Sequence, residues 1–175
     1  LVYRDGQKGS VRILRIDEGS WYRLKAVADF ERKAVELSVG GTLAGSFSFT
    51  GDTDDISLVG LATPDKEEMT VSIGYMCVYE NYLINEGFYS GEFPYDWECE
   101  AMDEGAVSVD PVGNEYKPLN LTVSDKSIID NTVVRKVFER SAGKIICEFR
   151  YLGDDKNTGV RFSLKDGERT AAELG

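Results

Sequence analysis

Apolar and polar residues alternate with a period of two along most of this chain, and this alternation constrains the fold more than any other feature. In the segment 22–30, one side carries Tyr22, Leu24, Ala26, Ala28 and Phe30. A period of two is typical of a strand with one buried face, whereas a helix needs a period near 3.6. The sequence therefore predicts an all-β protein.

The same pattern predicts strands at 11–16, 21–30, 34–39, 47–49, 56–61, 71–79, 106–109, 119–123, 133–138, 145–152 and 160–164. Turn residues separate them at intervals of roughly 8–15 residues, which is typical of an antiparallel β-sandwich. In the strand 71–79, one face is expected to hold Val71, Ile73, Tyr75, Cys77 and Tyr79. The segment 166–174 contains helix-forming residues, and it stays open between helix and strand.

The middle of the chain is predicted to be a connector. Residues 84–97 show no sustained periodicity and are rich in turn formers such as Gly87, Gly91 and Pro94. The chain therefore divides into 1–83, a linker at 84–97, and 98–175.

Composition excludes several classes of function. The formal net charge of −11 makes the chain a poor partner for nucleic acid. There is no His, which removes the usual general base and most catalytic zinc sites. No run of about 18 apolar residues is present, so no membrane insertion is expected.

Two sets of segments carry a resemblance to a known family. Residues 19–30 read GSWYRLKAVADF and 35–41 read VELSVGG, while the later segments 105–109, 117–121 and 143–149 read GAVSV, KPLNL and GKIICEF. Together they resemble the laminin-G-like / concanavalin A-like lectin–glucanase superfamily, bacterial extracellular type. The resemblance implies a jelly-roll β-sandwich, and it places the two halves of the chain in reverse of the family order.

Two origins of this permuted order are open. The chain is either the back half of one sandwich joined to the front half of the next in a tandem array, or a circularly permuted single sandwich. In both cases the halves are expected to pack together, because each alone would expose an apolar sheet face. The end segments 171–175 and 1–5 are then expected to lie close together as parts of one strand.

Candidate ligand-binding residues fall into two groups. Tyr95 and Trp97 belong to an aromatic cluster in the connector, and exposed aromatic rings stack on sugars. The alternative is that these rings fix the connector to the sandwich. The second group is Tyr3, Arg4 and Arg161, which would line a polar groove where arginines bind carboxylated sugars.

Acidic clusters give a candidate metal site and a candidate catalytic pair. Clustered carboxylates at Asp52, Asp54 and Asp55 suit Ca²⁺, although a turn rich in Asp is the simpler alternative. The carboxylates of Glu98 and Glu100, with Asp103, have some of the spacing of a glycosidase pair. They are expected to lie in an entrance loop rather than on a strand.

The sequence therefore predicts a non-catalytic carbohydrate-binding or adhesion module of a larger extracellular or cell-surface bacterial protein. Its partners would be a polysaccharide or glycan and flanking domains of the same polypeptide, with Ca²⁺ as the only candidate cofactor. Two alternatives remain: a structural spacer or interaction repeat without a ligand, and a glycosidase or polysaccharide lyase of the same fold. The absence of His argues against an enzyme, without excluding a lyase that uses Tyr, Lys or Arg as its base.

Overall fold

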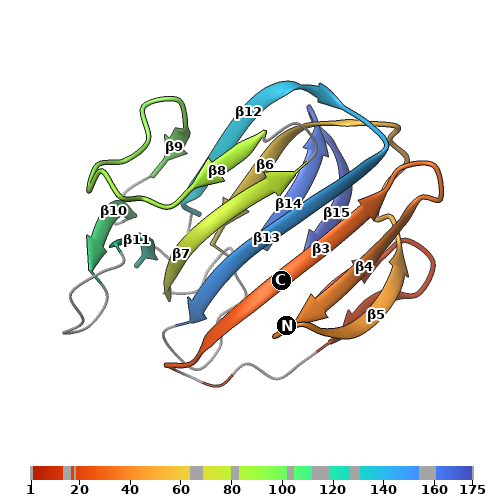
Figure 1. Cartoon of the computed structure of the whole chain (residues 1–175), viewed down its shortest axis with the longest axis horizontal. Coiled ribbons are helices and arrows are strands. Elements are labelled where there is room, and N and C mark those ends of the chain that lie inside the picture. The colour runs from red at the N-terminus through yellow and green to blue at the C-terminus, as the bar shows by residue number, and fades with distance from the viewer. Residues whose placement is uncertain are drawn as a thin grey trace.

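The chain forms an antiparallel β-sandwich, shown as a computed structural model in Figure 1. The structure describes residues 2–13, 17, 19–63, 69–79, 83–101, 105–111, 119–126, 131–153 and 161–174. Within these ranges every regular element is a strand, and none is a helix that could cross a membrane. The prediction of an all-β sandwich is confirmed.

Seven strands form the first sheet, called sheet A. Across the sheet their order is β2 (Gly9–Arg12), β1 (Val2–Asp5), β15 (Arg169–Leu174), β14 (Arg161–Asp166), β6 (Ile56–Ala62), β12 (Val133–Ser141) and β9 (Glu98–Glu100). The segment left open between helix and strand is therefore strand β15. Glu98 and Glu100 lie on strand β9, so the expectation of an entrance loop there was wrong.

The second sheet, sheet B, faces sheet A across the core. Its order is β10 (Ala106–Pro111), β11 (Leu119–Asp125), β7 (Met69–Tyr79), β13 (Lys144–Gly153), β3 (Trp21–Asp29), β4 (Ala34–Val39) and β5 (Thr42–Ser48), and β8 (Ile84–Glu86) also pairs with β7. In Figure 1 sheet B lies in front, with β6, β14 and β15 behind it.

In both sheets a strand from before the connector is inserted between strands from after it. In sheet A, β6 lies between β14 and β12; in sheet B, β7 lies between β11 and β13. Both β6 and β7 are thus hydrogen-bonded on each side to a strand that comes from after the connector. The buried side chains of both halves form one apolar cluster.

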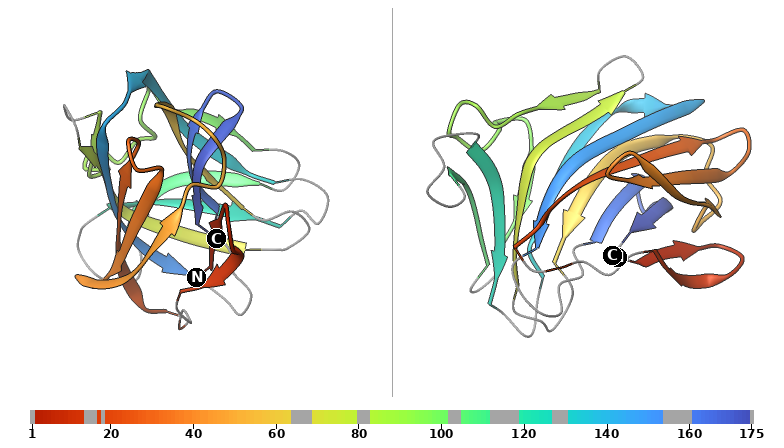
Figure 2. Two further views of the ribbon diagram at one scale, coloured as in Figure 1. Left: turned by 90° about the vertical axis from the view of Figure 1, so that its right-hand side faces the viewer. Right: turned by 60° about the horizontal axis from the view of Figure 1, so that its bottom comes forward.

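The two ends of the chain lie side by side (Figure 2). β1 pairs with β15 in antiparallel orientation, with Tyr3 opposite Leu174. The ends are close, as expected, but they are not one strand, because the chain direction reverses between β15 and β1.

A β-bulge in β7 changes which residues face the core. Arg150 pairs with Tyr75 and Tyr151 with Ile73, so Gly74 is left without a partner on β13. Before the bulge Ile73 points inward, and after it Met76 and Val78 are fully buried. The prediction that one face runs unbroken from Val71 to Tyr79 was therefore wrong.

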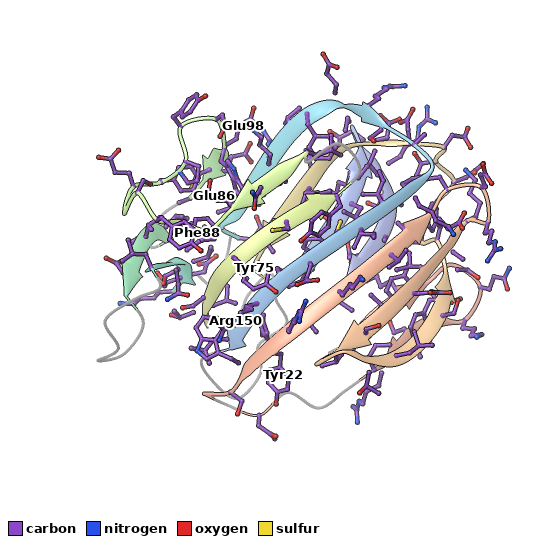
Figure 3. All side chains as sticks on the ribbon, viewed as in Figure 1. Tyr22, Tyr75, Glu86, Phe88, Glu98 and Arg150 are labelled. Atoms are coloured by element: carbon purple, nitrogen blue, oxygen red, sulfur yellow. The ribbon has the colours of Figure 1, made fainter. Side chains whose placement is uncertain are left out.

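The connector packs against the sandwich. After β8, Phe88 is fully buried, and its ring lies edge-to-face with that of Trp97 at 6.1 Å between centroids. A carboxylate oxygen of Glu86 accepts the backbone N–H of Phe88 at 2.6 Å. Figure 3 shows Glu86, Phe88 and Glu98 together at this edge of the molecule.

Candidate functional site

A groove lies on the outer face of sheet A, along strand β6. Core residues Val59 and Leu61 of β6 point inward, so Leu58, Gly60 and Ala62 point outward. These three form the floor over roughly 13 Å of strand. The groove encloses about 300 Å³, within the lower range of small-ligand sites.

Strand pairing sets the walls of the groove at its centre. Gly60 is opposite Ser163 on β14 and opposite Arg135 on β12. Ser163 in turn is opposite Glu173 on β15. Small side chains at the centre and long charged ones on either side leave the hollow between them.

Two further rows complete the walls. On one side of the central row, Ala62 lies between Arg161 and Val133. On the other side, Leu58 lies between Lys165 and Val137. The β14 wall therefore presents Arg161, Ser163 and Lys165 in alternation, while the β12 wall is partly apolar.

Ion pairs hold the long side chains at both edges. Arg4 Nε lies 2.9 Å from a carboxylate oxygen of Glu173. Arg135 reaches Glu98 at 2.6 Å through Nε and Glu100 at 2.8 Å through a terminal nitrogen. Because these two glutamates alternate on β9, both point to the face that carries Arg135. Hydrogen bonding to Glu98 raises the pKa of Arg135, which stays charged.

The structure brings two of the predicted ligand-binding residues to this face and separates the others from it. Arg161 lines the groove. Arg4 forms an ion pair with Glu173, which also lines the groove. Tyr3 lies on the same strand as Arg4 but points into the core, where its hydroxyl donates to the carbonyl of Ser48 at 3.1 Å. Burial raises the pKa of Tyr3.

The connector aromatics divide into a buried and an exposed set. Trp97 is buried against Phe88, so its ring has no face open to a ligand. Tyr95 is 98% exposed and Tyr89 is 82% exposed. Beside Tyr95, the carboxylate of Asp96 is bound by Lys136 of β12, which anchors this stretch to the edge of sheet A.

Two of the three predicted metal ligands, Asp52 and Asp54, lie close to the ammonium group of Lys33. Lys33 Nζ donates to Asp54 at 2.5 Å and to the carbonyl of Thr53, and it lies 3.5 Å from Asp52. The Lys33 hydrogen bond lowers the pKa of Asp54. Asp55 points elsewhere, 3.8 Å from Arg140. In the described ranges, no three His, Cys, Asp or Glu side chains are grouped as metal ligands, and Asp103 lies outside those ranges.

The outer face of sheet B carries a second polar network, centred on Glu148. Its carboxylate accepts hydrogen bonds from the Tyr75 hydroxyl at 2.6 Å and from Arg23 Nε at 2.9 Å. Figure 3 shows Tyr75 beside Arg150, and the Arg150 guanidinium lies 4.9 Å from the centroid of the Trp21 ring.

Tyr75 is poorly suited to act as a catalytic base. Burial and the hydrogen bond to Glu148 raise its pKa to about 12. The hydroxyl is therefore protonated at neutral pH, and it already donates its proton to a carboxylate.

Sequence reasoning missed most of the groove. Among the missed residues are Gly60, Ala62, Arg135, Ser163, Lys165, Glu168 and Glu173. Only their positions on adjacent strands bring them together, and the alternation within β14 was the one signal in the sequence that could have marked its outer face.

No protein-family model matches the chain, and no curated protein matches it.

Proposed function

We propose that the chain is a non-catalytic carbohydrate-binding module of the laminin-G-like, concanavalin A-like type, and that a glycan chain binds along β6. The observation that carries the proposal is the groove itself: an apolar floor of Leu58, Gly60 and Ala62 between walls that carry charged and hydroxyl side chains. Sugars need many hydrogen bonds together with flat contact area, and this surface offers both. In this proposal the module serves a larger extracellular or cell-surface bacterial protein.

The jelly-roll topology and the family remain part of this proposal. The two antiparallel sheets and the paired ends are compatible with them. Tyr95 and Tyr89 of the connector lie outside the groove, and their exposed rings offer a separate surface on which a sugar can stack.

Filling the groove tests the proposal. Ala62→Leu places a larger side chain on the floor, and Ala34→Leu is the matched control, because Ala34 is also half-buried and points outward but from β4 of sheet B. Both variants and the wild type are applied to a glycan array with and without EDTA, and a bound glycan is then titrated by calorimetry. We expect at least about tenfold weaker binding for Ala62→Leu and no change for Ala34→Leu.

Absence of binding to any plant, algal or host glycan would refute the proposal and favour a spacer. An equal loss of glycan binding in Ala62→Leu and Ala34→Leu would mean that the binding site does not lie along β6. Loss of binding in EDTA would show that a bound metal ion is needed, and would return Asp52, Asp54 and Asp55 to the site.

A glycosidase is the second candidate function, because two carboxylates, Glu168 and Glu173, line the same groove. Reducing ends released from a bound polysaccharide, and their loss in Glu168→Gln, would favour the enzyme. The binding module predicts that no reducing ends are released.

A further inference from the structure

The charged groups around the groove balance one another. Within the described part of the chain, the cations are Arg4, Arg135, Arg161 and Lys165, and the carboxylates are Glu98, Glu100, Glu168 and Glu173. The numbers of positive and negative charges in this set are therefore equal, at four each. The lining residues alone carry three cations and two carboxylates, and the ion-pair partners Arg4, Glu98 and Glu100 bring the sum to zero.

Two of the arginines are already bound to carboxylates of the protein. Arg4 is held by Glu173, and Arg135 is held by both Glu98 and Glu100. The expectation that arginines here bind carboxylated sugars therefore meets an obstacle: a ligand carboxylate at Arg4 or Arg135 would lie beside a carboxylate that the protein already places there. Carboxylates in contact repel one another, and the repulsion is strongest at Glu173, whose side chain is only 15% exposed.

The same pairs remain able to bind hydroxyl groups. A guanidinium has five N–H donors, and an ionised carboxylate accepts about four hydrogen bonds. The contacts of Arg135 with its glutamates involve its Nε and one terminal nitrogen, which leaves donors and acceptors side by side. A sugar hydroxyl both donates and accepts, so it can bridge such a pair without any change in charge.

The electrostatic field of the whole molecule also disfavours an acidic ligand. With a formal net charge of −11, the chain repels polyanions at a distance. A neutral polysaccharide approaches without this cost.

We infer that the ligand of the groove is a neutral glycan, free of carboxylate and sulfate groups, whose hydroxyls are bound by the Arg4–Glu173 and Arg135–Glu98 pairs. The inference rests on the proposed carbohydrate-binding function and narrows it to one class of ligand. Leu58 and Val133 offer apolar contact to the C–H faces of the sugar rings.

The test compares neutral polymers with charged forms of the same polymers. The panel contains neutral glucans, mannans and galactans, and the same polymers after oxidation of their primary hydroxyls to carboxylates. Affinity is measured at about 50 mM and about 500 mM NaCl, which changes the screening length severalfold. We expect a neutral polymer to bind with less than about a twofold effect of salt, and its oxidised form to bind at least about tenfold more weakly at low salt.

A matched pair of variants tests the role of the ion pairs. Glu173→Gln removes the partner of Arg4, whereas Asp110→Asn makes the same change in net charge at an exposed position on β10 of sheet B. Glu173→Gln is expected to weaken neutral-glycan binding and to reduce the penalty for the oxidised polymer; Asp110→Asn should do neither. Glu98→Gln, on the exposed edge strand, repeats the test if Glu173→Gln does not fold.

Three results would overturn the inference. Tighter, salt-sensitive binding of the oxidised polymers would mean that the ligand is acidic, and carbohydrate binding would stand. Equal effects of Glu173→Gln and Asp110→Asn would mean that overall charge, not the pair, governs binding. No binding of any polymer would remove both the inference and the proposed function.

Discussion

A single buried carboxylate, that of Asp5, joins the two sheets at the edge where β1 lies. Its Oδ1 accepts the backbone N–H groups of Gln7 and Lys8 at 2.8 and 2.7 Å, and its Oδ2 accepts that of Ser48 at 2.7 Å. Ser48 belongs to β5 of sheet B, so this one side chain connects the turn after β1 with the opposite sheet. Burial alone would raise the pKa of Asp5, but the three N–H donors outweigh it and lower the pKa.

We predict that Asp5→Asn lowers the free energy of unfolding at pH 7 by about 1–3 kcal/mol, because an amide nitrogen would replace one acceptor among three donors. Since the folded-state pKa lies below the ordinary value of 3.8, the contribution is present above that pH and is lost as the pH falls through the folded-state pKa. Urea unfolding of wild type and variant should therefore differ at pH 7 and converge under strongly acidic conditions.

The control for this measurement is Asp110→Asn, at an exposed carboxylate. A difference between wild type and Asp5→Asn that stayed constant down to the lowest pH at which the protein remains folded would contradict this assignment.

At the scale of elements, the connector is a structural part of the sandwich rather than a free tether. Strand β8 pairs with β7, Phe88 and Trp97 enter the core cluster, and Lys136 binds Asp96. Only the rings of Tyr89 and Tyr95 are left largely exposed along this segment. Aromatic residues in the connector thus have two different roles that composition alone does not separate.

Phe88→Ala and Tyr89→Ala should separate these roles. Phe88 is fully buried, so its truncation is expected to cost about 3–5 kcal/mol through lost burial and a cavity. Tyr89 is mostly exposed, and its truncation should change the free energy of unfolding by no more than about 0.5 kcal/mol. Chemical denaturation of both variants measures the difference; similar values for the two would show that the connector is not anchored by Phe88.

The sequence predicts the positions of strands well, but it predicts less well which side chains of a strand point into the core. Strand β7 shows why. Its bounds were nearly right, but the extra residue Gly74 shifts the alternation by one, so that Tyr75 and Tyr79 lie outside and Met76 and Val78 inside. A bulge depends on the pairing with β13, and no pattern within β7 reveals it. The groove has the same origin, since Gly60, Ser163 and Arg135 become neighbours only through the pairing of β6 with β14 and β12.

At the scale of the whole molecule, strands from before and after the connector depend on each other. β6 has β14 on one side and β12 on the other, and β7 lies between β11 and β13. Removing either part of the sequence would leave the other with unpaired strand edges and an exposed apolar face.

We predict that fragments 1–90 and 91–175, divided at the exposed Ser90, are each unfolded or aggregated alone and regain the native near-ultraviolet circular dichroism spectrum when refolded together. The intact chain should unfold in a single transition with coincident curves from different probes. A stable native-like spectrum from one fragment alone would contradict this interdependence.

The position of β6 between two later strands also bears on the order in which the chain can fold during its synthesis. Strand β6 emerges from the ribosome early, but both of its neighbours in sheet A are made more than 70 residues later, after residue 132. Until then both hydrogen-bonding edges of β6 lack their partners, and unpaired strand edges promote aggregation. Sheet A can therefore be completed only after β12 and β14 are translated, and β6 is exposed to aggregation during that interval.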